Sequence, residues 1–142
     1  MKNIALIGMP GSGKTTFGKG LARVLCCPFV DADDYLEKKE GRTIQSFFAE
    51  SEKAFRDAEE RTIRDLSRME GIVIATGGGV IKRKANVDRL HEGGLIIFLD
   101  RLPEDIVTDV EVEKRGCEII ELKQSPKRCL TQTSQTPFSV VL

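Results

Sequence analysis

Hydrophobic and polar positions alternate in blocks along this chain, in the pattern of buried strands separated by amphipathic helices. Four short apolar runs stand out, at Ile4–Ile7, Phe29–Val30, Ile72–Ala75 and Leu95–Leu99. Runs of this length are typical of strands buried on both faces of a parallel sheet. Helical patterns separate them, so we predict a three-layer α/β fold with helices on both faces of the sheet.

The second helical region is unusually long, from Asp34 to Met69. Gly41–Thr43 breaks the pattern once, and Ser51 is expected to break it again. We interpret residues 33–69 as a helical insertion that forms the wall of a substrate pocket. The alternative is a plain helical hairpin that packs on the sheet.

The composition of the chain argues against nucleic acid and membrane partners. The 142 residues suit one domain, and the formal net charge of zero gives no basic field for a nucleic acid partner. No apolar run approaches the ~20 residues of a membrane span, and no signal-peptide pattern is seen at the N-terminus. We therefore expect a cytoplasmic monomer without nucleic acid or membrane partners. Cys26 and Cys27 are expected to be small buried side chains.

The candidate chemistry begins at Gly8–Thr15, which matches the phosphate-binding loop pattern G-x-x-x-x-G-K-[ST]. Gly8 and Gly13 allow positive φ, so that successive N–H groups face one anion. Lys14 adds a point charge, and the Thr15 hydroxyl is a candidate Mg²⁺ ligand. The loop predicts a nucleoside triphosphate site, without deciding between a kinase, an ATPase, a GTPase and a motor.

Two carboxylates follow the second strand, where ligands sit in open α/β sheets. Asp31 and Asp33 are two residues apart, so an extended segment would place them on one side. One is a candidate to hold Mg²⁺ through water, and the other to accept a proton from a substrate hydroxyl. The alternative is that Asp33 or Asp34 caps the next helix.

A triple glycine, Gly77–Gly79, follows the third strand. Three glycines cost backbone entropy, which indicates a place where a ligand approaches the backbone and is held by N–H groups. Arg56 is a candidate clamp for a substrate carboxylate, and Glu59 lies on the same helix face, where it can orient Arg56. For such a pair alone, the alternative is a solvated surface ion pair.

The chain resembles the shikimate kinase family over about residues 1–101. The resemblance rests on the order and spacing of four motifs: the phosphate-binding loop, Asp31-x-Asp33, Phe55-Arg56-x-x-Glu59 and Gly77–Gly79. The resemblance implies a P-loop fold like that of nucleoside monophosphate kinases. It also implies transfer of the ATP γ-phosphoryl to the 3-hydroxyl of shikimate, in aromatic amino acid biosynthesis.

The resemblance also assigns roles residue by residue. Lys14 and Asp33 would be catalytic, and Thr15 and Asp31 would hold Mg²⁺. Shikimate would contact Asp33, Arg56, Gly77, Gly78 and Gly79. ATP would contact Gly11, Ser12, Gly13, Lys14, Thr15 and Thr16.

The C-terminal part departs from the family pattern. The family has Arg-Pro-Leu-Leu in its lid, whereas Arg115 is followed here by Gly116-Cys117-Glu118. We therefore divide the chain into a kinase core, 1–115, and a divergent tail, 116–142, with an ordered or a disordered tail both open. We expect lower stability and reduced or absent turnover. A frameshift, a splice variant, a non-catalytic nucleotide-binding module and a kinase of another polyol acid such as gluconate stay as alternatives.

Overall fold

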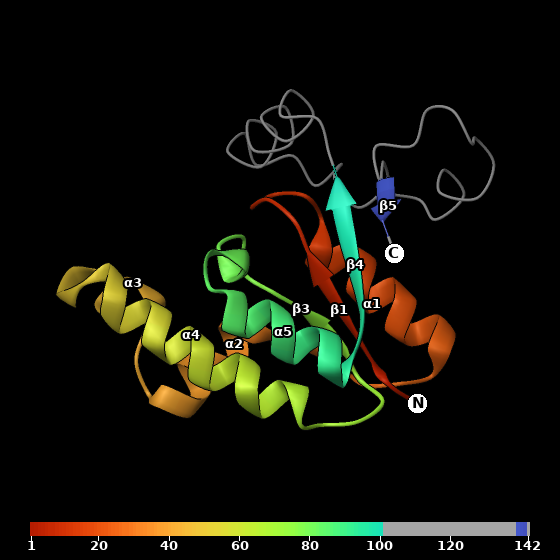
Figure 1. Cartoon of the computed structure of the whole chain (residues 1–142), viewed down its shortest axis with the longest axis horizontal. Coiled ribbons are helices and arrows are strands. Elements are labelled where there is room, and N and C mark those ends of the chain that lie inside the picture. Colours follow the sequence, from red (N-terminus) through yellow and green to blue (C-terminus); the bar gives the residue numbers. More distant parts are fainter. Residues whose placement is uncertain (101–138, 142) are drawn as a thin grey trace, which may run out of the picture.

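The described residues of this computed structural model, 1–100 and 139–141, form one sheet with helices on both faces (Figure 1). The strands stand in the order β2-β3-β1-β4-β5. Their bounds are Asn3–Ile7 for β1, Phe29–Asp31 for β2, Val73–Ala75 for β3, Gly94–Asp100 for β4 and Ser139–Val141 for β5. The first four are parallel and each lies within one residue of a predicted run, which confirms the α/β fold.

The fifth strand was not predicted. β5 runs antiparallel to β4 and pairs Val141 with Phe98, so it covers one edge of the sheet. It belongs to the segment that we interpreted as a divergent tail. Residues 116–138 and 142 of that tail lie outside the described residues.

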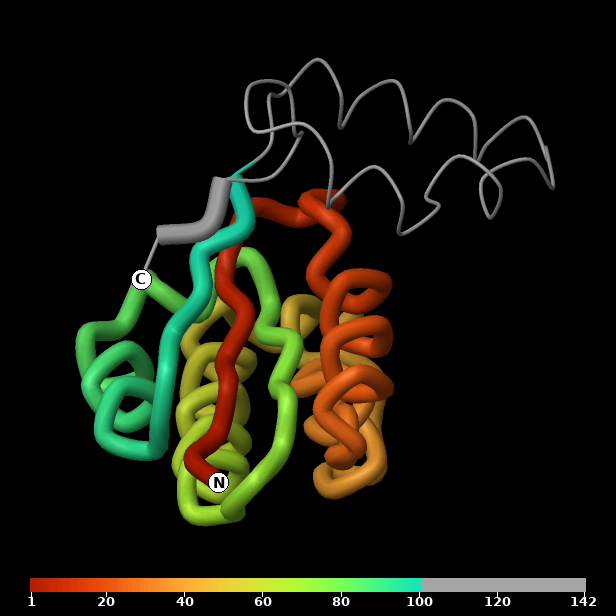
Figure 2. Tube along the Cα trace, turned by 90° about the vertical axis from the view of Figure 1, so that its right-hand side faces the viewer, coloured from red at the N-terminus to blue at the C-terminus, as the bar shows by residue number. Residues whose placement is uncertain are grey.

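The helices divide between the two faces of the sheet. α1 (Lys14–Leu25) covers one face, and α4 (Glu52–Ser67) and α5 (Lys84–Gly93) cover the other, as Figures 1 and 2 show. α2 (Ala32–Glu40), α3 (Ile44–Glu50) and the 3₁₀ helix η1 (Val80–Lys82) complete the described helices. Among the described residues, no helix has the length and apolar character to span a bilayer.

Alternation along the strands places a hydrophobic core on each face. In β1, Leu6 packs toward α1 while its neighbour Ala5 packs toward α4 and α5. Leu6 and Ile74 are fully buried, and burying one such side chain contributes about 1.5–3 kcal/mol. These two cores hold β1 and β3 rigidly, and the loops that follow them carry the candidate site.

The long helical stretch is three helices, with breaks where the sequence predicts them. Gly41 ends α2 with a φ of 67°, which suits glycine. The Thr43 hydroxyl accepts a hydrogen bond from the Ser46 N–H at 3.2 Å, and the Ser51 hydroxyl accepts one from the Ala54 N–H at 3.0 Å. These caps start α3 and α4. A third core joins the helices, formed by Leu36, Phe47, Phe55 and Ala58.

The expectation of two buried cysteines is wrong for Cys26, which is exposed, whereas Cys27 is half-buried. Cys26 ends α1 in the left-handed conformation, with a φ of 52°, and its N–H bonds back to the last turn of the helix. A residue in that position extends beyond the packed face of the helix, so burial is lost.

Candidate active site

The phosphate-binding loop has the backbone that its glycines predict. Gly8, Gly11 and Gly13 have φ values of 151°, 78° and 86°. A Cβ at Gly8 would come within 2.6 Å of the Leu99 carbonyl oxygen, so glycine also lets the loop pass close to β4. The loop therefore joins the end of β1 to the start of α1 in the expected strand–loop–helix arrangement.

Lys14 lies folded onto this loop. Its Nζ donates to the carbonyl oxygens of Gly8 and Met9, both at 2.8 Å, and to the Ser12 hydroxyl at 3.3 Å. Burial lowers the pKa of Lys14, and the charges of Asp33 and Asp31 oppose that shift. Two carbonyl oxygens and one hydroxyl therefore hold the ammonium group of Lys14 against the loop.

The start of α1 is suited to an anion. Gly13 caps the helix without a side-chain hydrogen bond, and the first turn carries no acidic residue. Thr15 and Thr16 are exposed in that turn. The helix therefore presents its N–H groups and the positive end of its dipole to the loop.

Asp31 is the carboxylate that caps α2. Its Oδ1 accepts from the N–H groups of Asp33 and Asp34, at 3.0 and 3.4 Å. The alternative, that Asp33 or Asp34 caps this helix, is therefore wrong. β2 continues to Asp31, whose extended backbone is the conformation that a capping residue needs, and this places Asp33 in the first helical turn.

The second oxygen of Asp31 faces the phosphate-binding loop. Asp31 Oδ2 accepts a hydrogen bond from the Thr15 hydroxyl at 2.9 Å. The two residues predicted to hold Mg²⁺ are thus brought together from β2 and α1. A hydroxyl and a carboxylate oxygen are ligands that suit a hard cation, which keeps several waters as its other ligands.

Asp33 has the electrostatics of a general base. Burial first, and then the charges of Asp31, Glu59 and Asp34, raise its pKa to about 6, while Lys14 acts in the opposite direction. A carboxylate with this pKa is ionised at neutral pH and still binds a proton readily.

Each glycine of Gly77–Gly79 leaves room for a different neighbour. A Cβ at Gly77 would lie 3.2 Å from Asp33 Oδ1 and 3.3 Å from Glu59 Oε1. At Gly78 it would lie 2.4 Å from Pro10 Cδ, and at Gly79 2.5 Å from Arg56 Nη2. The glycines therefore let three parts of the site converge.

Arg56 and Glu59 form a buried ion pair, with Nη1 and Oε2 2.8 Å apart. Their side chains are 12% and 6% exposed, which excludes a solvated surface pair. Arg56 Nε is buried without a hydrogen bond and lies 3.5 Å from Glu52 Oε1. The guanidinium thus keeps donor capacity that its hydrogen bond to Glu59 does not use.

The predicted site residues meet at one edge of the sheet. The phosphate-binding loop follows β1, Asp31 ends β2 and Gly77–Gly79 follow β3, so all lie at the carboxyl ends of parallel strands. Sequence reasoning missed Pro10 and Glu52. Pro10 occupies a variable position of the loop motif, and Glu52 is one of many charged residues on its helix, so neither gave a signal.

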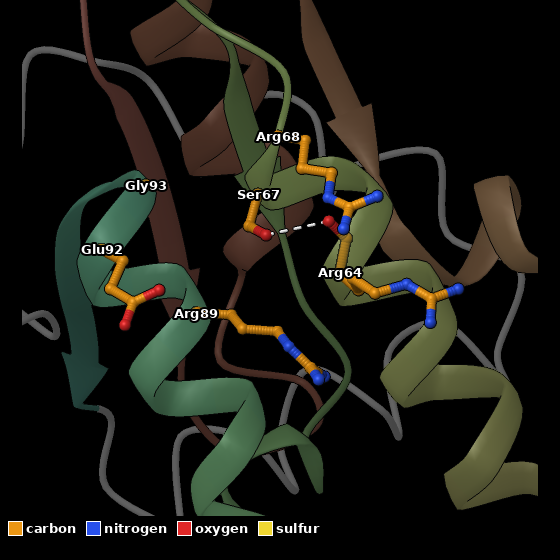
Figure 3. Close-up of a pocket in the computed structure, with 6 residues that line it drawn as sticks. All are labelled: Arg64, Ser67, Arg68, Arg89, Glu92 and Gly93. Carbon is orange, nitrogen blue, oxygen red and sulfur yellow. Dashed lines mark hydrogen bonds between the residues drawn. The ribbon is translucent and has the colours of Figure 1, made fainter.

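A cavity of about 340 Å³ lies elsewhere, between the C-terminal ends of α4 and α5 (Figure 3). Its lining residues are Arg64, Ser67, Arg68, Arg89, Glu92 and Gly93. Arg64 and Arg68 lie at the C-terminus of α4, where they complement the negative end of the helix dipole, and Arg89 forms an ion pair with Glu60 at 3.0 Å, so the three arginines are accounted for without a ligand. The cavity is remote from the glycine turn and is not part of the candidate site.

Known proteins that are similar to this chain include shikimate kinases, the family that its motifs resemble. A sequence model described as shikimate kinase matches residues 10–136, beyond the part on which the sequence resemblance rested. A shikimate kinase of Clostridium botulinum (strain Eklund 17B / Type B) is 45% identical over 116 residues, 81% of this chain and 70% of the relative. One of Aeromonas salmonicida is 36% identical over 135 residues, 94% of this chain and 78% of the relative.

Solved structures give the same family. The shikimate kinase of Acinetobacter baumannii in complex with shikimate matches with a TM-score of 0.71 and 37% identity, over 75% of this chain and 59% of that one. A sugar kinase from Janibacter, 22% identical with a TM-score of 0.55, shows the fold alone. This chain spans about three fifths of the length of the first two solved structures that it matches. The phosphate-binding loop, the geometry of the site and these matches show that the chain belongs to the shikimate kinase family.

Proposed function

We propose that this chain transfers the γ-phosphoryl group of ATP to the 3-hydroxyl of shikimate. The observation that carries the proposal is the convergence of the phosphate-binding loop, Asp33 and Arg56 around Gly77–Gly79. This arrangement offers a triphosphate site, a base and a carboxylate clamp at one sheet edge.

ATP would bind with its phosphates in the loop. The backbone N–H groups of Gly11 to Thr16 would contact phosphate oxygens, and Lys14 would exchange its carbonyl partners for the β- and γ-phosphates. Thr15 and Asp31 would hold Mg²⁺, since their side chains already meet. The ion would neutralise charge that develops on the phosphates.

Shikimate would bind across the glycine turn. Its carboxylate would take the unused donors of Arg56, while Glu59 holds the guanidinium in place. Backbone N–H groups of Gly77, Gly78 and Gly79 would contribute, and Asp33 would accept a hydrogen bond from the hydroxyl groups.

The chemical step requires little covalent work from the protein. As the 3-hydroxyl oxygen forms its bond to the γ-phosphorus, its proton passes to the Asp33 carboxylate and ADP leaves with the electrons of the broken bond. A pKa of about 6 lets Asp33 take this proton at neutral pH. Lys14 stabilises the transferred group, so positioning and electrostatics supply the catalysis.

The charge of the chain bears on its partners. A net charge of zero gives no attraction to nucleic acid. We propose a cytoplasmic monomer that acts on two small molecules, ATP and shikimate.

The test is a coupled ADP-release assay on the full chain with Mg²⁺-ATP, with and without shikimate. The proposal expects release that depends on shikimate and that Lys14→Met abolishes. A release rate that is the same without shikimate would overturn it. Gluconate in place of shikimate tests the other acceptor, and no observation on the site favours it.

The same assay tests the expectation of reduced or absent turnover. That expectation concerns the lid region, which lies outside the described residues, so it stays a prediction. A kcat within the usual kinase range of ~1–100 s⁻¹ would contradict it. ATP binding without shikimate-dependent release would instead favour a non-catalytic nucleotide-binding module.

A further inference from the structure

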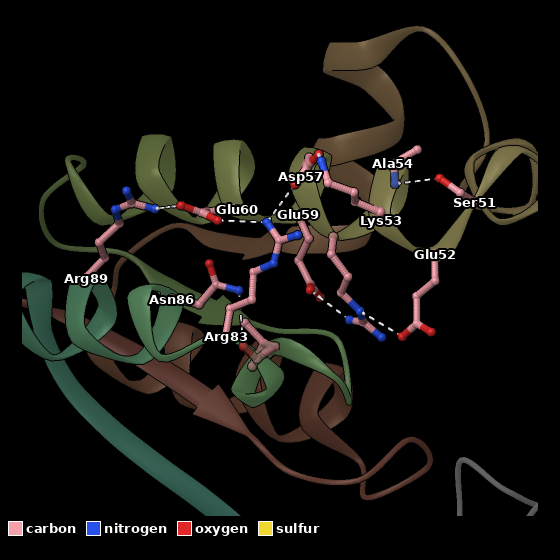
Figure 4. Close-up of polar contacts among 12 residues, drawn as sticks. Ser51, Glu52, Lys53, Ala54, Asp57, Glu59, Glu60, Arg83, Asn86 and Arg89 are labelled. Atoms are coloured by element: carbon pink, nitrogen blue, oxygen red, sulfur yellow. Dashed lines mark hydrogen bonds and ion pairs between the residues drawn. The ribbon is translucent and has the colours of Figure 1, made fainter.

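The clamp around Arg56 contains a second, exposed ion pair. Glu52 Oε1 accepts a hydrogen bond from Lys82 Nζ at 2.8 Å, and the same oxygen lies 3.5 Å from Arg56 Nε. Figure 4 shows Glu52 and Glu59 approaching one guanidinium from two sides. Lys82 ends η1, the short helix that follows the glycine turn. Glu52 thus stands between two cations from different segments.

The two carboxylates that face Arg56 differ in how freely they can move. Glu59 is 6% exposed and makes a hydrogen-bonded ion pair at 2.8 Å, so it is a fixed partner. Glu52 is 58% exposed, and its Oε1 lies 3.5 Å from Arg56 Nε, at the outer limit of a hydrogen bond and without hydrogen-bonding geometry. A small rotation of the Glu52 side chain toward Nε would fill the donor position that a substrate carboxylate needs.

The charges of this cluster balance before any substrate arrives. Arg56 and Lys82 are positive, and Glu52 and Glu59 are negative. Lys82 is the strongest influence on Glu52, since its hydrogen bond and charge hold the pKa of that carboxyl below its usual value. Arg56 lowers the same pKa less, so Lys82 is the stronger of the two cations that hold Glu52.

We propose that Glu52 competes with the substrate carboxylate for Arg56, and that Lys82 restrains Glu52 and so sets the affinity of the clamp. Lys82 is then a positioning residue, which acts on the substrate through Glu52 and Arg56. The inference rests on the proposed function, because it takes shikimate as the carboxylate that Arg56 binds.

The test is a double-mutant cycle read by calorimetric binding of shikimate to the full chain. Lys82→Gln frees Glu52 to occupy Arg56, so the Kd of shikimate should rise by about two- to fivefold, the range for exposed ion pairs. Glu52→Gln removes the competitor, so the Kd should fall by about the same factor. The double variant should bind like the Glu52→Gln protein, because Lys82 has nothing left to restrain.

Lys84→Gln is the matched control. Lys84 is two residues from Lys82 and forms an exposed ion pair with Asp88. Its substitution by Gln removes the same positive charge as Lys82→Gln does. It should leave the Kd of shikimate unchanged, and none of the four variants should change ATP binding. Where ADP release is measurable, the KM of shikimate should move while kcat stays constant.

The outcomes separate the inference from the proposed function. If the unmodified protein binds no shikimate, the proposed function fails and the inference fails with it. If it binds shikimate and Lys82→Gln and Glu52→Gln shift the Kd in the same direction, or not at all, the inference alone is overturned. Thermal unfolding of each variant checks that these exposed substitutions leave the fold intact.

Discussion

Arg56 lies so close to Gly79 that a Cβ at that glycine would come within 2.5 Å of Nη2 and 2.6 Å of Nη1. Gly79 has a φ of −97°, which alanine also adopts, so the constraint is space and not backbone conformation. We therefore predict that Gly79→Ala displaces the end of the Arg56 side chain. Shikimate binding should weaken by at least about tenfold, or 1.4 kcal/mol, while the protein stays folded. Calorimetry with shikimate and with ATP measures this.

Two other glycines serve as controls. Gly78→Ala would push on Pro10, including its backbone nitrogen at 3.0 Å, so it should disturb the phosphate-binding loop and weaken ATP binding as well. Gly20, in α1, has nothing within 4 Å of a Cβ, so Gly20→Ala should leave both ligands bound and stabilise the helix by up to about 1 kcal/mol. Unaltered shikimate binding by Gly79→Ala would mean that the Arg56 clamp is placed wrongly.

The contribution of Asp33 to the stability of the metal-free protein should fall as the pH rises. Its pKa is raised from 3.8 to about 6, so from about pH 4 to 6 the folded state keeps a proton that the unfolded state has lost. The contribution of Asp33 to the free energy of unfolding therefore falls with rising pH over this window, and the loss is complete above pH 6. After allowance for partial exposure, the loss should be on the order of 1–2 kcal/mol.

Urea unfolding in EDTA from pH 4 to 8 tests this, with Asp33→Asn as the comparison. The variant should be more stable than the parent protein at pH 8, and the difference should shrink toward pH 4. Parallel profiles for the two proteins would show that Asp33 titrates normally.

Asp31→Asn should separate the metal role of Asp31 from its capping role. Asparagine caps helices as well as aspartate does, so α2 should form normally. The variant loses the negative charge and the oxygen that meets the Thr15 hydroxyl. The Mg²⁺ concentration for half-maximal nucleotide binding should rise on the order of tenfold. An unchanged Mg²⁺ requirement would remove Asp31 from the metal site.

Much of the fold and of the site was predictable, because local rules fix those parts. The loop Gly8–Thr15 needs its glycines for positive φ, and Gly41, Thr43 and Ser51 lie at breaks in the helical pattern, where such residues favour helix ends. The four parallel strands lie in a sheet with helices on both faces, so their apolar runs are continuous.

The parts that were not predictable depend on tertiary contacts. Whether Asp31 or Asp33 caps α2 depends on where β2 ends, which its pairing with β3 decides. The burial of Arg56 and Glu59 requires the glycine turn to cover them, and spacing along one helix carries no such information. β5 lies at the end of the tail, after a polar stretch without periodicity, and its place in the sheet depends on its pairing with β4.

The most direct test of the account is calorimetric binding of shikimate to the full chain and to Arg56→Ala. We predict that the full chain binds shikimate and that Arg56→Ala weakens binding by about 2–4 kcal/mol, because the substrate carboxylate loses its charged partner. ATP binding should be nearly unchanged. Equal losses of shikimate and ATP affinity would show that Arg56 is structural, and full shikimate affinity in the variant would contradict the assignment of the site.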